Sequence, residues 1–226
     1  MAQAAGIILV DTEDLDPWKA TTVGVGEMIL DAAEKGCRNF IIGIGGSATT
    51  EGGIGMLSAL GYRFLDEAGN VLKPEFSSLD KISWIDGSGV PAVLSECHFQ
   101  IACDVNNPLC GENGAVYVYG PQKGVSDQDK KPMDQMMQKY AESIFTYTGS
   151  DVSEHPGTGA AGGLGFAFTS MVPNVTLKSG IQIVLEAIEL EKEIADADIV
   201  ITGEGRIDFQ TAMGKVPVGV AKLAKK

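Results

Sequence analysis

Hydrophobic residues recur with a helical period in several stretches of this chain. One apolar stripe, with spacings of three and four residues, comprises Val25, Met28, Ile29, Ala32 and Ala33. Gly36 follows that stripe and is a typical residue for the end of a helix. A longer stripe begins after Ser126, a typical N-cap residue, and comprises Met133, Met136, Met137, Tyr140, Ala141 and Ile144. We expect its methionines to pack in the core, and we predict further helices at 54–60, at 178–188 and from residue 216 onwards.

Short apolar runs between turn residues predict the strands. Residues 40–44 and 99–105 have the composition of buried strands, and 199–201 form a third, shorter run. Residues 62–72 are interrupted by Glu-Ala-Gly-Asn and are typical of a hairpin, which would make the sheet partly antiparallel. Strands that alternate with helices predict an α/β fold. Because no parallel strand follows the last helix, we expect the final part of the fold to be incomplete.

Composition and charge narrow the class of protein. With 226 residues, of which 44% are hydrophobic and 21% charged, the chain can bury one large core or two modest ones, which excludes overall disorder. The net charge of −13 disfavours nucleic acid and anionic membranes as partners. A small anion could still bind to a local cluster of N–H groups and cations. We expect reduced cysteines, no signal peptide and a cytoplasmic location.

Glycine is more frequent than usual, with 29 residues in 226 and no collagen-like period. The loop 45–53 follows the predicted strand 40–44 and begins Gly-Gly-Ser-Ala-Thr-Thr. Its backbone N–H groups and hydroxyls precede a helix, which suits the binding of a phosphate or a carboxylate. A tight turn without a ligand is the alternative. Three glycine clusters in one chain, at 45–53, 156–165 and 202–208, favour ligand binding.

Charged residues accompany these loops. Asp104 lies at the end of the predicted strand 99–105, where a carboxylate could hold Mg²⁺, take a proton from an attacking hydroxyl, or only cap its neighbour's backbone. Lys123 lies between turn residues, and the segment 202–208 combines both signs of charge. In phosphoryl transfer such carboxylates bind metal ions, and Arg or Lys neutralises the developing negative charge.

A dinucleotide-binding oxidoreductase is one alternative function. The pattern Gly43-x-Gly45-x-x-Ala48 after a strand matches the dinucleotide fingerprint formally, and Asp66 lies near the distance at which an acid would hold a ribose. Against this interpretation, the next helix is only about two turns long, and a hairpin rather than a parallel strand follows it. The sequence also contains no P-loop motif.

Five segments in order resemble the bacterial type of glycerate kinase. They are Ile42-Gly-Ile-Gly-Gly-Ser-Ala-Thr49, Ala102-Cys-Asp-Val-Asn-Asn-Pro-Leu109, Tyr119-Gly-Pro-Gln-Lys-Gly124, Gly159-Ala-Ala-Gly-Gly163 and Val200-Ile-Thr-Gly-Glu-Gly-Arg-Ile-Asp208. The resemblance covers essentially the whole chain. It implies a two-domain α/β enzyme, with one domain inserted into the other and the active site in the cleft between them. It also implies that ATP phosphorylates D-glycerate, with Mg²⁺ required and 2-phosphoglycerate as the usual product.

The resemblance further implies which parts of such an enzyme this chain contains. Residues 1–195 would be mainly the inserted, mixed-sheet α/β domain, and 196–226 a part of the flavodoxin-like or Rossmann-like domain. Family members are longer at both ends, so half of the cleft would be absent. The chain alone could therefore be a non-catalytic binding fragment. Apolar surface left exposed by the absent segments could make it a homo-oligomer.

The matched motifs suggest roles for named residues. Asp104, Lys123 and Arg206 are the candidate catalytic residues, with Asp104 as base or metal ligand and the other two as charge stabilisers. Candidates for holding the substrate or a phosphate group are Gly45, Gly46, Ser47, Ala48, Thr49, Gly162, Gly163, Gly203 and Gly205. Candidates for binding the metal are Asp104, Glu204 and Asp208. One departure from the family pattern is Thr50-Glu51 in place of Asn-Asp, which could displace a metal or hydroxyl contact of the acid.

Overall fold

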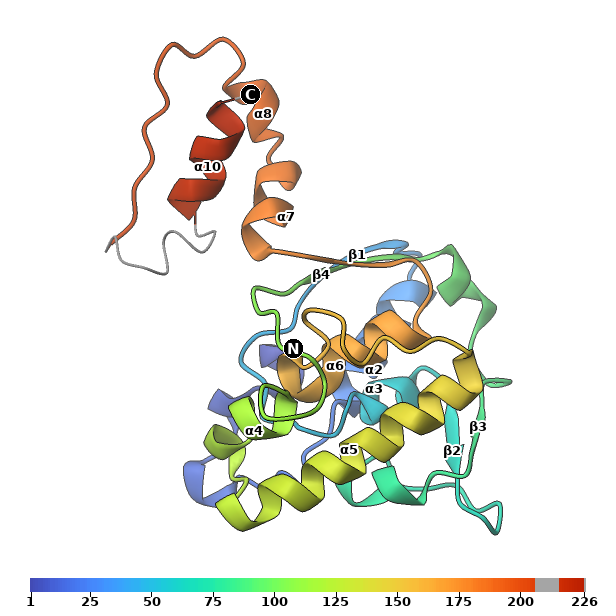
Figure 1. Ribbon diagram of the computed structural model, residues 1–226. Coiled ribbons are helices and arrows are strands. Elements are labelled where there is room, and N and C mark those ends of the chain that lie inside the picture. The colour runs from blue at the N-terminus through green and yellow to red at the C-terminus, as the bar shows by residue number, and fades with distance from the viewer. Residues whose placement is uncertain (206–215, 226) are drawn as a thin grey trace. The chain divides into compact units, whose positions relative to one another are not determined.

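The computed structural model describes residues 1–205 and 216–225. These residues divide into two compact units, Met1–Leu177 and Lys178–Lys226 (Figure 1). The predicted assignment of 1–195 and 196–226 to two domains of a larger enzyme stays a prediction.

The first unit contains a three-stranded sheet with the order β1-β4-β5. Strand β1 (Asn39–Gly43) lies parallel to β4 (His98–Ala102), with Phe40 opposite Phe99. Strand β5 (Val175–Lys178) lies on the other side of β4. The predicted strands 40–44 and 99–105 are thereby confirmed within a few residues, and with them the α/β class, but β1 is not buried as predicted, since Ile41 is 61% exposed.

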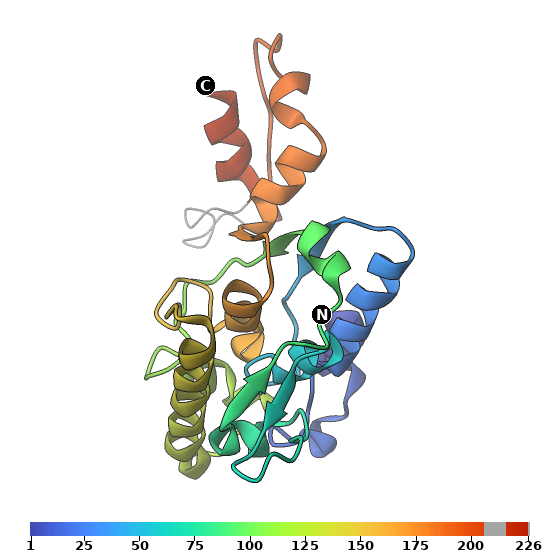
Figure 2. The ribbon, with the colours of Figure 1, turned by 90° about the vertical axis from the view of Figure 1, so that its right-hand side faces the viewer.

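A separate two-stranded sheet is antiparallel. Strand β2 (Arg63–Leu65) pairs with β3 (Trp84–Asp86), seen as the adjacent teal and green arrows of Figure 2. The predicted hairpin over 62–72 is confirmed in part: Val71 forms an antiparallel bridge with Leu65, the N–H of Leu72 donates to Phe64 at 2.8 Å and the N–H of Asp66 donates to Asn70 at 3.0 Å, but the return arm is not a strand of the sheet. Pro74 follows closely and has no N–H group to extend that pairing. The antiparallel partner of β2 therefore comes from further along the chain.

Four helices carry most of the packing in the first unit, namely α2 (Val23–Glu34), α3 (Ile54–Ala59), α5 (Asp127–Thr148) and α6 (Ala160–Met171). Ser126 caps α5 as predicted, since its side chain accepts a hydrogen bond from the backbone N–H of Asp129. The remaining helical segments are short: α1 (Ala2–Ala5), α4 (Ala115–Tyr119), η1 (Ile7–Leu9), η2 (Thr12–Asp14), η3 (Phe76–Lys81), η4 (Ala92–Glu96) and η5 (Pro121–Lys123).

Aromatic and sulfur-containing side chains join the sheet to α5 and α6 in one core. Phe99 of β4 contacts Phe168 of α6 with ring centroids 6.4 Å apart, and Tyr140 of α5 meets Phe166 edge to face at 5.8 Å. Met133 and Met137 of α5 are fully buried in the same cluster. The methionine stripe is therefore core packing, as its helical spacing predicted.

The second unit contains α7 (Gly180–Ala187), α8 (Leu190–Glu193) and α10 (Val216–Ala224). The predicted N-cap Ser179 accepts a hydrogen bond from the backbone N–H of Gln182. The predicted strand at 199–201 is wrong, since these residues have no regular structure and Ile201 is 92% exposed. A strand needs a neighbour to satisfy its backbone, and no described residue pairs with this segment.

Two glycine segments approach each other closely in the first unit. The backbone N–H of Gly52 donates to the carbonyl of Gly162 at 2.8 Å. Gly162 has a φ of +68°, and a Cβ atom there would lie 2.6 Å from Cα of Thr50 and would collide with the carbonyl of Thr49. A Cβ at Gly163 would lie 2.7 Å from Cα of Gly52. Only glycine permits this contact, because L residues are strained at positive φ and have no space here.

We predict that Gly162→Ala destabilises the protein far more than Gly69→Ala. Both glycines have positive φ, but nothing lies within 4 Å of a Cβ placed at Gly69. The control should therefore cost about 1 kcal/mol from backbone strain alone, and Gly162→Ala about 3 kcal/mol or more. Urea unfolding of both variants measures the difference. Equal losses would mean that the contact with the 49–52 backbone is unimportant.

Candidate functional site

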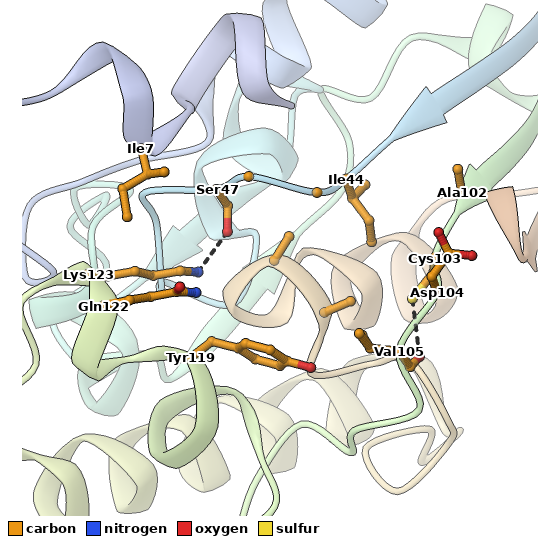
Figure 3. Close-up of a pocket in the computed structure, with 14 residues that line it drawn as sticks. Ile7, Ile44, Ser47, Ala102, Cys103, Asp104, Val105, Tyr119, Gln122 and Lys123 are labelled. Carbon is orange, nitrogen blue, oxygen red and sulfur yellow. Dashed lines mark hydrogen bonds between the residues drawn. The ribbon is translucent and has the colours of Figure 1, made fainter. Parts of the chain in front are cut away.

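A pocket opens in the first unit where β1 and β4 end (Figure 3). Its volume is about 340 Å³, within the range of about 300–1,000 Å³ that is usual for small-molecule sites. Ligands of parallel α/β sheets commonly bind at the carboxyl ends of the strands. Five segments line the pocket: the start of η1, the loop after β1, the end of β4 with the loop that follows it, the segment from the end of α4 into η5, and the start of α6. The residues are Ile7, Ile44, Gly45, Gly46, Ser47, Ala102, Cys103, Asp104, Val105, Tyr119, Gln122, Lys123, Ala160 and Ala161.

The loop after β1 presents open backbone to this pocket. Nothing lies within 4 Å of a Cβ placed at Gly45, and at Gly46 only Ala2 does. The N-terminal segment fixes the other side of the loop, because the N–H of Ile7 donates to Gly46 and the N–H of Ala48 donates to Ala5. Among the described residues, no acceptor takes the backbone N–H of Gly45 or Ser47. The loop can therefore receive an anion at close approach, as its sequence indicated.

Lys123 is the buried cation of the pocket. Its side chain is almost fully enclosed, and Nζ donates to Oγ of Ser47 at 2.7 Å and to the carbonyl of Thr49 at 2.5 Å. Burial lowers the pKa of Lys123 from its ordinary 10.5 to about 7, while the nearby Glu51 carboxylate raises it. The lysine thus fixes two points of the glycine loop, and its amine can exist in both protonation states near neutral pH.

Glu51 anchors the end of the same loop without facing the pocket. Its fully buried carboxylate accepts hydrogen bonds from the N–H (2.7 Å) and hydroxyl (2.5 Å) of Thr22 and from the backbone N–H groups of Gly53 (2.9 Å) and Gly55 (3.2 Å). Burial raises the pKa of this carboxyl, and the four donors oppose the shift. The departure from the family pattern therefore falls on an acid that caps α3, and Glu51 does not line the pocket.

Asp104 lies at the other end of the pocket from Lys123 in the view of Figure 3. It is exposed and directly follows Cys103, whose thiol donates to the carbonyl of Val105 at 3.4 Å. Burial raises the pKa of Cys103, which keeps the thiol protonated at neutral pH. A single carboxylate facing a pocket fits Mg²⁺, which often takes only one or two protein carboxylates together with substrate phosphates and water.

The other predicted site residues fall into three groups. Thr49 and Ala48 are buried beside the pocket-lining Ser47, and the hydroxyl of Thr49 has no partner among the described residues. Gly162 and Gly163 are buried against the 49–52 backbone and do not line the pocket, although their neighbours Ala160 and Ala161 do.

The third group belongs to the segment 202–208. Gly203, Glu204 and Gly205 lie in the second unit, where both glycines are exposed. Arg206 and Asp208 lie outside the described residues. The roles proposed for all five stay predictions.

Two polar residues of the pocket, Tyr119 and Gln122, were not among the residues predicted from the sequence. The hydroxyl of Tyr119 donates to Oδ1 of Asn107 at 2.6 Å, and the Asn107 amide donates to the carbonyl of Asn113 at 2.7 Å. The side chain of Gln122 runs beside that of Lys123 (Figure 3). Both residues belong to the segment 119–124, so the turn that indicated Lys123 was also the signal for them.

The dinucleotide interpretation does not fit this geometry. Helix α3 has only six residues, and the following strand β2 pairs with β3 rather than with β1. A dinucleotide unit instead needs a full crossover helix and a second parallel strand. Asp66 is occupied in a turn, where its carboxylate accepts from the N–H groups of Ala68 at 2.9 Å and Asn70 at 2.8 Å.

No cluster of three or more His, Cys, Asp or Glu side chains that could hold a metal ion occurs in 1–205 and 216–225. Within the same ranges, no helix combines the length and the apolar character that crossing a bilayer requires.

Comparisons with known proteins agree on one family. The sequence model of the glycerate kinase family matches residues 1–226. The chain is 49% identical over 226 residues to the glycerate 2-kinase of Escherichia coli strain K12, covering all of this chain and 59% of that protein. It is 46% identical over 225 residues to a glycerate kinase of Bacillus subtilis strain 168, again covering all of this chain and 59% of the relative.

A solved structure has the same fold. It is the crystal structure of a provisionally assigned glycerate kinase 2 from Salmonella typhimurium LT2, which superposes with a TM-score of 0.90 at 46% sequence identity. The match covers 99% of this chain and 59% of that one. The chain therefore spans about three fifths of the length of these relatives.

We predict that the free energy of unfolding of Lys123→Met, relative to wild type, is higher at about pH 6 than at about pH 9. The folded-state pKa of Lys123 is about 7, well below its ordinary 10.5. Between these values the unfolded chain binds more protons than the folded chain, so the cost of burying the charge is complete below pH 7 and declines as pH rises. The free energy of unfolding of the variant relative to wild type should fall by about 2–3 kcal/mol over this range.

Urea unfolding at several pH values measures this difference. Lys131→Met, which removes an exposed lysine, is the matched control and should show no such trend. A constant difference between Lys123→Met and wild type would contradict the lowered pKa.

Proposed function

Because the chain belongs to the glycerate kinase family, we propose that the protein that carries it uses ATP and Mg²⁺ to phosphorylate D-glycerate to 2-phosphoglycerate. The observation that supports this most is the pocket at the ends of β1 and β4. It has a buried ammonium group at one end, a carboxylate at the other and open glycine backbone between them. An acidic, hydroxylated small molecule suits that distribution of charge.

Asp104 is the proposed base. A substrate hydroxyl oxygen attacks the γ-phosphorus of ATP, the bond from that phosphorus to the β,γ-bridging oxygen breaks, and ADP leaves. The hydroxyl proton passes to the Asp104 carboxylate. Lys123 and the N–H groups of Gly45 and Ser47 hold an anionic group of a ligand, and because the loop is already fixed, little reorganisation accompanies the reaction.

Mg²⁺ would neutralise charge on the phosphates, and Asp104 is the residue of the described pocket that could hold it. Glu204 and Asp208 are proposed as further ligands, and Arg206 as a further charge stabiliser. Gly203 and Gly205 would provide backbone donors in that segment, while Gly162 and Gly163 would act by supporting the glycine loop rather than by touching the phosphates.

A second candidate is a non-catalytic binding fragment. The observation that favours it is length, since the relatives are longer and this chain spans about 59% of each. In that case the pocket would bind a small acid without turnover.

The proposal also covers location and partners. We propose a cytoplasmic protein whose partner is a small organic acid rather than nucleic acid, because a net charge of −13 repels polyanions. Self-association through exposed apolar surface is proposed as well. In the first unit the N-terminal residues Ile8 (80% exposed) and Leu9 (58% exposed) offer such surface.

We expect glycerate-dependent release of ADP by a hybrid in which the flanking segments of the Escherichia coli relative are joined to this chain. A coupled assay with Mg·ATP and D-glycerate measures it, and the chain alone is assayed in parallel. Turnover by the hybrid only would support a kinase whose site needs the flanking segments. Turnover by both would remove the binding-fragment candidate, and turnover by neither would contradict the kinase proposal.

Asp104→Asn in the hybrid should lower kcat by about a hundredfold or more, because the amide cannot accept the proton. Asp80→Asn, which changes an exposed carboxylate away from the pocket, is the matched control and should leave kcat unchanged. Near-normal turnover of Asp104→Asn would disprove the role of Asp104 as base.

A further inference from the structure

The buried charge of Lys123 has no anionic partner in its pocket. Its two hydrogen-bond acceptors, Oγ of Ser47 and the carbonyl of Thr49, are both neutral. Within the described residues, no carboxylate forms an ion pair with it. A buried cation that has only neutral partners is costly, so this end of the pocket is prepared for an anion.

The number of N–H donors that Lys123 has left for a ligand limits which anion its ammonium group can bind. An ammonium group has three N–H donors, and Lys123 uses two of them on the glycine loop. One donor remains for a ligand, and Lys123 is the only cationic side chain that lines the pocket in the described part of the chain. This end of the pocket carries one positive charge, with the open N–H groups of Gly45 and Ser47 as further donors, and a single positive charge matches a singly charged carboxylate. A triphosphate carries several negative charges and needs several cations.

The opposite end of the pocket has the complementary chemistry. The Asp104 carboxylate would repel a second anion but can accept a hydrogen bond from a hydroxyl. Tyr119 and Gln122 line the wall beside Lys123 and offer neutral polar groups (Figure 3). A small hydroxy acid therefore has one favoured orientation, with its carboxylate at Lys123 and its hydroxyls towards Asp104.

From this geometry we infer that the Lys123 end of the pocket is the subsite for the carboxylate of the substrate acid, and that the phosphates of the nucleotide bind elsewhere. The inference rests on the proposed function and adds to it which anion the loop 45–47 receives. Lys123 then acts in binding, as the residue that distinguishes a carboxylate from a neutral analogue of the same shape.

Titration calorimetry tests the subsite. It measures how tightly this chain binds D-glycerate and its neutral analogue D-glyceramide. We expect D-glyceramide to bind about ten- to a hundredfold more weakly, as the loss of one charge-assisted hydrogen bond predicts. Lys123→Met should weaken D-glycerate binding by at least a similar factor and should weaken D-glyceramide binding much less. Lys131→Met, at an exposed position, should change neither.

A measurement on the wild-type chain avoids any effect of the substitution on folding. Affinity for D-glycerate should fall about tenfold for each pH unit above 7, because the pKa of Lys123 is about 7 and only the protonated amine attracts the carboxylate. Affinity for D-glyceramide should stay constant.

Other titratable groups act on the same region and need a control. Cys103, Asp104 and Tyr119 line the pocket, and Glu51 and the amino group of Met1 lie at the glycine loop. Burial raises the pKa of both Cys103 and Tyr119 and lowers that of the Met1 amine. A pH dependence that survives in Lys123→Met would overturn the inference, because it would belong to one of these groups.

Competition separates this inference from the proposed function. We expect neither ATP nor inorganic phosphate to displace D-glycerate from the chain. Displacement by either, or D-glycerate binding that does not depend on Lys123, would overturn the carboxylate subsite while leaving phosphorylation by the hybrid intact. Absence of D-glycerate binding together with absence of turnover would contradict both.

Discussion

The buried ammonium group of Lys123 is the contact on which the candidate site depends. It joins the η5 turn to the loop after β1 through Ser47 and Thr49, and so fixes the loop from the side opposite the N-terminal segment. Glu51 holds the end of that loop to Thr22 and to the start of α3. Residues 47–51 thus contact or contain two buried charged side chains, those of Lys123 and Glu51, which would ordinarily be solvated. A purely structural turn would not require the free-energy cost of burying them.

The burial of Lys123 and Glu51 at this loop links the fold to the proposed chemistry. A loop fixed before the ligand arrives does not have to be ordered when an anion binds, which preserves binding free energy for discrimination. The close backbone contact between 49–52 and 162–163 supports the same loop, while Gly45 and Gly46 leave backbone open to the pocket. The protein therefore uses glycine in two ways within one site, as a tight packing surface and as an open cradle.

Much of this organisation could be predicted from the sequence, and the misses have physical causes. Strands β1 and β4 and the cap Ser126 follow from apolar patterning and cap residues, Asp104 was indicated by its position at a strand end, and Lys123 by its position between turn residues. The role of Gly162 could not, since a glycine that faces a ligand and one that faces another backbone look alike in a sequence. Residues 199–201 have strand composition, but a strand also requires a neighbour, and local composition carries no information about one.

A crystal structure of the protein with D-glycerate would locate each oxygen of the ligand. We expect a carboxylate oxygen within hydrogen-bond distance of Nζ of Lys123, with the hydroxyl groups directed towards Asp104. A ligand bound in the reverse orientation, or outside the pocket at the ends of β1 and β4, would contradict the carboxylate subsite at Lys123.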